Sequence, residues 1–300
     1  MPVGLKAPDN ILPVAGVRLA TVASNMRYTG RDDLLLLVFS EQAKTAAVFT
    51  KNRYCAAPVT VAKRHLQAHQ PRALLINAGN ANAGTGQQGE IDALACCALL
   101  AEKINCLPEE VLPFSTGVIG QSLPMSQFTQ GIEEAVDQML LASSDWFAAA
   151  SAIMTTDTLP KAYSEQCQIG GETVTVTGIA KGSGMICPDM ATMLAYIVTD
   201  AKVDEAVLQS LLSQAVEASF NRITVDGDTS TNDALTLTAT AQVGSESISE
   251  ATSNEAQALG AVIQRVAIRL AQAVIRDGEG ATNLLRLMSL VACLKRIVWR

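Results

Sequence analysis

The sequence predicts a mixed α/β or α+β protein whose strands and helices pack in layers. Short apolar runs with the composition of strands alternate with longer segments whose apolar residues have helical spacing. No repeat of fixed period is visible, which argues against a solenoid or a propeller. Hydrophobic residues make up 49% of the 300 residues and charged residues only 17%, so the chain can build a large core and is not disordered.

The first third of the chain contains four short apolar runs that we interpret as strands, partly buried on both faces. They span Leu34–Ser40, Ala46–Thr50, Val59–Ala62 and Ala73–Ile76. The next segment, Ile91–Ile104, has apolar residues on all sides of a helical projection, which predicts a buried helix.

The rest of the chain continues the mixture of helices and strands. Helices are predicted over Met125–Ala142 and over Val203–Phe220, the second with acidic residues near its start. Alternation with period two predicts strands with one polar face over Glu172–Thr177 and Ala234–Val243. Ala256–Ile275 has the pattern of a long, strongly amphipathic helix.

Charge and hydropathy exclude several classes of protein. The chain has 22 Lys plus Arg against 29 Asp plus Glu, a net charge of −7, which argues against a nucleic-acid-binding surface. No apolar run approaches the roughly 20 residues of a membrane span, and the N-terminus has no secretory signal pattern, so we expect no membrane segment and a cytoplasmic location. The seven cysteines include no C-x-x-C pair and are interpreted as reduced, mostly buried thiols.

Two motifs suggest metal sites only superficially. His65 and His69 would share one face of a helix, but no Glu stands in the zincin position, and a solvated helix face is the preferred interpretation. Because the chain has no other histidine, a Ser-His-Asp or Cys-His mechanism is disfavoured. The acidic segment VDGDTSTND, residues 225–233, lacks the Gly and Glu of an EF-hand loop and is interpreted as a hydrogen-bonded turn. We therefore expect no metal.

Two loops and one longer segment are candidates for a site. Asn77–Gly86 and Ser115–Gly120 contain small residues that let backbone N–H groups approach a ligand, although tight turns are the commoner use of such loops. In Ile179–Asp200, a strand ends near Lys181, Gly-Ser-Gly follows, and Thr192 begins an apolar run. That hydroxyl is either the cap or start of a strand or a nucleophile at the mouth of a core element, and spacing alone favours the former.

The segment KGSGMICPDMATMLAYIVTDA closely resembles the processing site of the ornithine acetyltransferase family, also called bifunctional glutamate N-acetyltransferase / amino-acid acetyltransferase. Other segments resemble the same family in the same order, from residue 10 to about residue 283: AAVFTKNRYCAAPV, INAGNANAGTG, STGVIGQSLP, AIMTTDTLPK, NRITVDGDTSTNDA and IRDGEGAT. The resemblance implies an α-β-β-α layered fold that the family shares with self-cleaving aminopeptidases.

The resemblance further implies a mechanism. The precursor would be cleaved between Ala191 and Thr192 into an α fragment, residues 1–191, and a β fragment that starts with residues 192–283. Thr192 would then be the nucleophile, with its own free α-amine as the general base, which explains how the chain works without a catalytic histidine. It would take acetyl from N-acetylornithine and pass it to glutamate, a step of arginine biosynthesis.

The site residues that the resemblance implies fall into two groups. Two of them donate hydrogen bonds to the oxyanion, and four bind substrate; they are Thr116 and Gly117 for the first group, and Thr155, Lys181, Thr192 and Glu279 for the second. The Lys181 cation suits substrates that carry carboxylates. No cofactor is implied, with acetyl-CoA as a second acetyl donor in bifunctional members, and two copies of each fragment are expected to assemble.

The resemblance stops after Thr282. Residues 284–300 form an atypical basic and apolar tail where the family continues, and we interpret this tail as a truncation or a shifted reading frame that would impair acetyl transfer. A membrane-surface helix is the rival interpretation of the tail. Two alternatives to the acetyltransferase also stay open: a related self-processing aminopeptidase or amidohydrolase, and an inactive truncated remnant.

Overall fold

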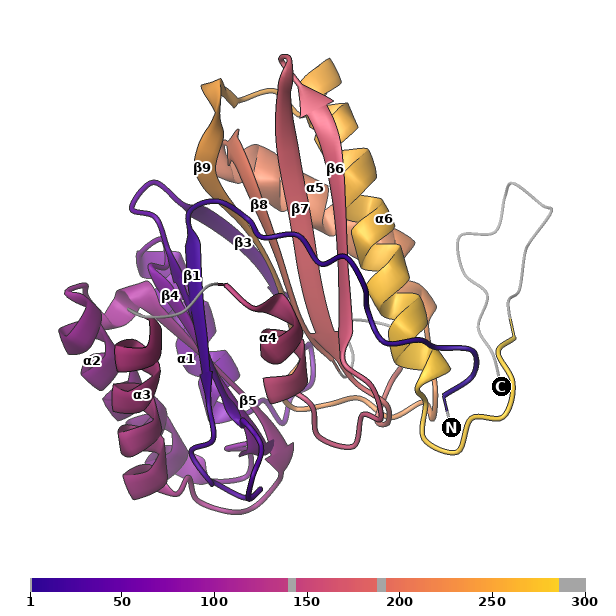
Figure 1. Ribbon diagram of the computed structural model, residues 1–300. Helices are drawn as coiled ribbons and strands as arrows, with labels where there is room; N and C mark the ends of the chain where they lie inside the picture. The colour runs from indigo at the N-terminus through magenta and orange to yellow at the C-terminus, as the bar shows by residue number, and fades with distance from the viewer. Residues whose placement is uncertain (1, 140–143, 188–192, 286–300) are drawn as a thin grey trace.

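Two β-sheets lie face to face with helices on both outer sides (Figure 1). The computed structural model describes residues 2–139, 144–187 and 193–285. In chain order its elements are β1 (Val17–Val22), β2 (Leu34–Phe39), β3 (Lys44–Phe49), α1 (Ala57–Ala68), β4 (Ala73–Asn80), α2 (Gly86–Ile104), η1 (Pro108–Glu110), β5 (Val111–Val118), α3 (Met125–Met139), α4 (Trp146–Ala152), β6 (Lys161–Ile169), β7 (Glu172–Lys181), β8 (Leu194–Val203), α5 (Glu205–Ala218), η2 (Phe220–Arg222), β9 (Ala234–Ile248) and α6 (Asn254–Arg276). The strand orders are β1-β2-β4-β5 and β3-β9-β8-β7-β6, which confirms the α-β-β-α layering.

Strand β2 shows why the layers form. All six of its residues are buried, and alternate side chains point to opposite faces of the sheet. One set joins the core between the two sheets, and the other joins the core under α2 and α3: Leu35, Leu37 and Phe39 in the first, Leu34, Leu36 and Val38 in the second. An unbroken apolar run is therefore what a strand covered on both faces requires.

The outer face of the second sheet is covered by α5 and α6 (Figure 1). By length and composition alone, α6 is the one helix among the described residues that could cross a membrane. Its apolar face packs instead on β6 and β7, and it approaches so closely that a Cβ on Gly178 would lie 2.8 Å from Leu270 Cδ1. We therefore describe α6 as a core helix, in agreement with the amphipathic pattern.

The polar face of β9 lies inside the molecule, between the sheets. Thr236, Thr238 and Thr240 alternate with apolar residues that face the helices, and all three are buried. Thr238 Oγ1 lies 2.9 Å from Thr45 Oγ1, and Thr240 Oγ1 donates to the carbonyl of Ala15 at 2.6 Å. The hydroxyls of Thr238 and Thr240 thus find partners on the neighbouring strand β3 and on Ala15, whereas the hydroxyl of Thr236 has none among the described residues.

Two sequence predictions in the region of α1 are wrong. Val59–Ala62 belongs to α1 and is not a strand; Pro58 in the first helical turn has the φ angle that a helix start needs. His65 does not lie on a solvated face: it is buried, and its Nδ1 is 2.8 Å from the carbonyl oxygen of Val111 on β5. Only His69, after the last turn, is exposed.

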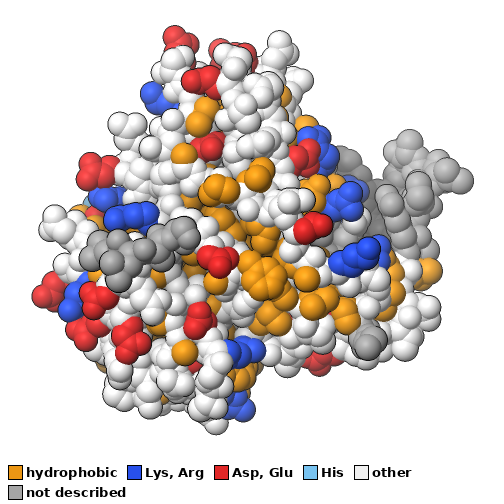
Figure 2. Space-filling model, viewed as in Figure 1, with side chains coloured by type: hydrophobic (Ala, Val, Ile, Leu, Met, Phe, Trp, Pro, Cys, Tyr) orange, Lys and Arg blue, Asp and Glu red, His pale blue; other side chains and the backbone are white. Residues whose placement is uncertain are grey.

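The N-terminal segment crosses the second sheet before the first strand begins (Figure 1). Leu12 N donates to Ser164 Oγ on β6, and Leu12 O accepts from Thr177 Oγ1 on β7. Figure 2 shows apolar side chains gathered in the middle of this face of the molecule. Phe147 on α4, which is 45% exposed, is among the large apolar residues at the surface.

Candidate active site

The ends of β5 and β7 bring two of the predicted site residues into contact between the sheets. Phe114 on β5 and Ile179 on β7 face the core between the sheets, so Thr116 and Lys181, two residues further along, face the same space. Lys181 Nζ donates to Thr116 Oγ1 at 3.1 Å, and both residues are buried. The two sheets are therefore linked by a polar contact at this end.

The Thr116 hydroxyl is arranged to donate a hydrogen bond to a ligand. Because its oxygen accepts from Lys181, its own hydrogen is left to donate to another acceptor. Gly117 follows with φ +137°, and a Cβ on it would lie 2.2 Å from the carbonyl carbon of Gly79. Only glycine lets β4 and β5 approach so closely here.

Lys181 lies in a strongly charged but dry environment. Burial lowers the pKa of its ammonium group, and the neighbouring Lys161 lowers that pKa further. Asp157, Asp233 and Glu279 oppose this effect by favouring the cation. An ammonium held this way can bind a carboxylate without competition from bulk water.

Asp157 connects the loop before β6 to the end of β7. Its carboxylate accepts from Gly182 N at 2.7 Å and from Thr155 N at 3.1 Å, and it binds Lys161 Nζ at 2.6 Å. Although burial pushes the pKa of Asp157 upward, the Lys181 and Lys161 cations outweigh it and hold that pKa below its usual range. The predicted residue Thr155 is thus tied to the strand end that carries Lys181.

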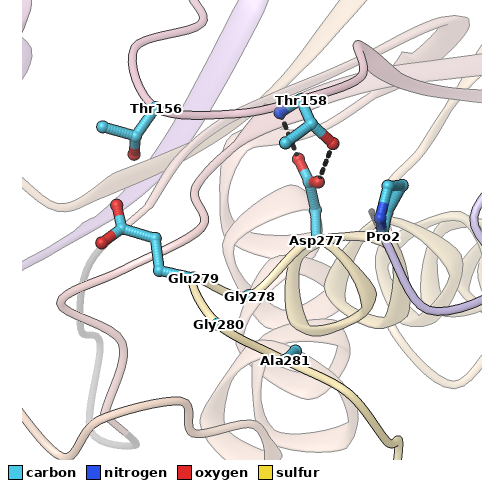
Figure 3. A pocket seen from close by; sticks show the side chains of 8 residues that line it. All are labelled: Pro2, Thr156, Thr158, Asp277, Gly278, Glu279, Gly280 and Ala281. Atoms are coloured by element: carbon cyan, nitrogen blue, oxygen red, sulfur yellow. Dashed lines mark hydrogen bonds between the residues drawn. The ribbon is translucent and has the colours of Figure 1, made fainter.

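Glu279 approaches the same strand end from the turn after α6. Its backbone N donates to the carbonyl of Ser183 at 2.7 Å, and a Cβ on Gly184 would lie 2.9 Å from its carboxyl carbon. Ser183 Oγ also lies 2.6 Å from Thr156 Oγ1. A cavity of about 120 Å³ is lined by residues that include Thr156, Thr158, Asp277 and Glu279. Figure 3 shows Thr156 and Glu279 near each other, and Asp277 hydrogen-bonded to Thr158 beside them.

Strand β8 begins beside Lys181. Ala191 and Thr192, the predicted cleavage pair, lie outside the described residues. Met193, the first described residue after them, accepts from Ala234 N at 3.1 Å through its carbonyl. Leu194 is then paired with Lys181 on one side and with Ala234 on the other.

The acidic segment 225–233 forms the hydrogen-bonded turn that the sequence predicts. Asp226 accepts from the backbone amides of Met185 and Ile186, the second at 2.8 Å, and so fixes the chain after the Gly-Ser-Gly sequence. Ile186 O in turn accepts from Val225 N at 2.9 Å. Within the described ranges, no group of three or more His, Cys, Asp or Glu side chains could hold a metal ion.

The predicted loop 77–86 is a loop only over residues 81–85, because residues 77–80 belong to β4 and α2 begins at Gly86. Asparagine side chains hold this connection in place. Asn77 Nδ2 donates to Asn80 O at 2.8 Å, and Asn82 Nδ2 donates to Gly89 O at 2.8 Å. Asn232 Nδ2 ties this loop to β5 because it donates both to Ala81 O and to Ser115 O. The asparagines thus stabilise the strand end from which Thr116 projects.

Sequence reasoning missed three residues around this site. Asp157, Lys161 and Asp277 form a buried ion network, with both Asp–Lys distances under 3 Å. All three lie inside or next to segments quoted for the family resemblance, AIMTTDTLPK and IRDGEGAT. That placement is the available signal, but no pattern in the sequence brings Lys161 and Asp277, 116 residues apart, together.

The chain is similar to known proteins in both sequence and fold. The model of the ArgJ family matches residues 18–290. The arginine biosynthesis bifunctional protein ArgJ of Methylococcus capsulatus is 49% identical over 278 residues, which are 93% of this chain and 67% of that protein. The crystal structure of ornithine acetyltransferase complexed with ornithine, from Mycobacterium tuberculosis, has a TM-score of 0.50 and 33% identity and covers 59% of this chain and 93% of its own.

A more distant likeness shows the fold alone. The L-aminopeptidase D-Ala-esterase/amidase of Ochrobactrum anthropi, described as a variant of the Ntn hydrolase fold, has a TM-score of 0.52 at 11% identity. It covers 90% of this chain and 89% of its own. The layered assembly is therefore shared with an amide-cleaving enzyme.

Proposed function

Because this chain belongs to the ArgJ family, we propose that it is a self-cleaving threonine acyltransferase of arginine biosynthesis that moves acetyl from N-acetylornithine to glutamate. The observation that carries the assignment of residues is the bond between Lys181 Nζ and Thr116 Oγ1, made where β8 begins. A donor hydroxyl and a cation are thus placed within reach of the strand that follows Thr192 directly in the chain.

The proposed chemistry uses each group at a stated atom. Thr192 Oγ attacks the acetyl carbonyl while its α-amine takes the hydroxyl proton, and the acetyl-enzyme forms as ornithine leaves with that proton. The negative charge on the carbonyl oxygen is stabilised by the Thr116 hydroxyl, whose hydrogen is free to donate, and by Gly117 N–H. Glutamate then enters, and its amine attacks the acetyl carbon of the acetyl-enzyme. The bond from that carbon to Thr192 Oγ breaks, N-acetylglutamate leaves, and the proton lost by the amine returns to Thr192 Oγ through the α-amine.

The substrates are bound by opposite charges. Lys181 binds the carboxylate that donor and acceptor share, and Glu279, exposed at the turn after α6, binds the amino group of ornithine. Thr155 contributes from the loop that Asp157 holds. Both substrates are small molecules, and the reaction needs no cofactor; acetyl-CoA is the candidate second donor.

The length of the solved relative supports cleavage before Thr192. In the comparison with the Mycobacterium tuberculosis enzyme, 59% of this chain's 300 residues correspond to 93% of the solved chain, which is therefore about 190 residues long. That length matches residues 1–191, the α fragment. We propose that two copies of each fragment assemble.

Intact-mass measurement of the purified protein tests the cleavage. Cleavage at this bond yields pieces of roughly 20 and 12 kDa, by their share of the 31.6 kDa chain. Thr192→Ala should give one uncut species, and Thr192→Ser should still be cut because its hydroxyl remains. Cleavage of the alanine variant at the same bond would refute the assignment of the nucleophile.

The acetyl-transfer assay separates the acyltransferase from its alternatives. Ornithine release from N-acetylornithine is measured with and without glutamate, beside hydrolysis of a dipeptide amide. Release that depends on glutamate supports transfer. Release that is equal without glutamate indicates a hydrolase, and no release by a correctly cut protein indicates an inactive remnant.

A further inference from the structure

A buried ion network lies next to the proposed site but takes no part in the mechanism above. Lys161 Nζ binds Asp157 Oδ1 at 2.6 Å and Asp277 Oδ2 at 2.7 Å, and all three side chains are fully buried. Burying three charges is costly, and hydrophobic residues of similar volume often stabilise a fold as well or better. The burial of three charges here therefore points to a role beyond stability.

The network joins three segments that carry predicted substrate-binding residues. Asp157 holds the loop with Thr155 to Gly182 at the end of β7. Asp277 accepts from Thr158 N at 2.8 Å and also from Thr158 Oγ1, and it lies two residues before Glu279. Lys161 at the start of β6 connects the two carboxylates.

We propose that Asp157 is a positioning residue, which holds the ammonium group of Lys181 in its charged form and directs it at the carboxylate of the substrate. The proposal rests on the proposed function, in which Lys181 binds that carboxylate. Asp157 does not touch the substrate; it acts through Gly182 N, next to Lys181, and through its charge.

The charges around Lys181 support this role. Five influences act on its pKa: burial and Lys161 lower it, while Asp157, Asp233 and Glu279 raise it. Asp157 is the largest of the three that favour the cation. It is also the carboxylate whose position is fixed on three sides, by Lys161, Gly182 N and Thr155 N.

Two substitutions in the network should shift the pKa of Lys181 in opposite directions. Replacing Asp157 by Asn removes the negative charge but keeps an oxygen that can accept from Gly182 N, so the pKa of Lys181 should fall. Replacing Lys161 by Met removes a positive charge that lowers this pKa, so the pKa of Lys181 should rise. The two variants should thus shift one titration in opposite directions, which a general loosening of the fold would not do.

The test is an NMR titration of Lys181 in the whole chain labelled with ¹³C,¹⁵N-lysine, its signal assigned from its loss in Lys181→Met. In Asp157→Asn the titration midpoint should fall by about one to three pH units, the usual effect of one nearby opposite charge. Asp33→Asn is the matched control, because Asp33 is also buried and accepts from Ser24 N at 2.8 Å and Met26 N at 2.9 Å, but lies just before β2 in the other half of the molecule. It should leave the midpoint unchanged.

Two further variants change the same charges in other ways. If Lys161→Met does not fold, because it leaves two buried carboxylates unpaired, the double variant Asp157→Asn/Lys161→Met removes both charges and should return the midpoint toward that of the parent chain. Asp157→Glu keeps the charge and should titrate closer to the parent than Asp157→Asn does. An unchanged Lys181 midpoint in folded Asp157→Asn would overturn the proposal.

Acetyl transfer is measured in parallel, so that the two proposals fail separately. At pH values above the lowered Lys181 midpoint, the KM for N-acetylornithine should be higher in Asp157→Asn than in the parent chain, which still binds the substrate at that pH. If the parent chain transfers no acetyl group, the proposed function fails, and the titration still decides whether Asp157 sets the charge of Lys181.

Discussion

Gly117→Ala and Gly120→Ala form a matched pair that tests the close approach of β4 and β5. Both glycines have positive φ, +137° and +80°, which other residues rarely adopt, so alanine at either position carries a backbone cost of about 1–3 kcal/mol. Their surroundings differ. A Cβ at position 120 meets nothing within 4 Å, whereas one at position 117 would lie 2.2 Å from Gly79 C and 2.5 Å from Asn80 N.

The difference between the two variants measures the backbone contact. Those atoms of Gly79 and Asn80 belong to the main chain of β4, so they cannot rotate away, and the ends of β4 and β5 must separate to admit the methyl group. Overpacking of this kind costs about 1–3 kcal/mol. Gly117→Ala should therefore be about 1–3 kcal/mol less stable than Gly120→Ala.

Urea unfolding of both variants on the Thr192→Ala background gives the two free energies without interference from chain cleavage. The slopes of free energy against urea should agree, so that the midpoints report stability alone. Equal stability of the two variants would refute the reasoning, because it would show that β4 and β5 can part at this end without cost.

Other predictions concern single groups. In an active form of the enzyme, Thr116→Ala should lower kcat by about 100- to 1,000-fold with little change in KM, and Thr116→Ser should restore most of it; an unchanged kcat in the alanine variant would remove Thr116 from the oxyanion hole. Tyr196 is fully buried, and its hydroxyl has no hydrogen-bond partner among the described residues. Tyr196→Phe should therefore raise the free energy of unfolding by about 1–3 kcal/mol, while the edge-on ring contact with Phe114, 5.3 Å between centroids, is kept. A loss of stability would reveal a partner for the hydroxyl. Burial raises the pKa of Cys106 to about 11, so the thiol stays mostly protonated below that pH. The rate of its alkylation, followed by mass spectrometry, should rise about tenfold per pH unit up to pH 11. A plateau of the rate near pH 9 would contradict this.

The periodicity of the sequence predicted most elements because their burial is regular. Leu34–Phe39 is apolar throughout because both faces of β2 are covered, and α6 is amphipathic because only one of its faces packs on a sheet. The prediction of a strand at Val59–Ala62 is wrong because four apolar residues fit a buried strand and a buried helical turn equally well. The spacing of the buried residues in α1, which include Val59, Ala62 and His65, is helical, and extending the window to His65 would have shown it.

The site was accessible to sequence reasoning only in part. Thr116 and Lys181 were singled out by resemblance, and the structure places their side chains in contact. Asp157 was not, because its significance comes from Lys161 and Asp277, and the pairing with Asp277 depends on how the end of α6 meets the start of β6. Long-range pairs of this kind leave no periodic trace in a single sequence.

The strand order of the second sheet has a consequence for the molecule after cleavage. In the order β3-β9-β8-β7-β6, the two strands that follow residue 192 lie between strands that precede it. Six residue pairs join β3 to β9, and six join β7 to β8, so each fragment completes the other's sheet. A cut before Thr192 would thus turn unfolding into the dissociation of two polypeptides. The melting temperature of the cut protein would then depend on its concentration, whereas that of an uncut variant would not.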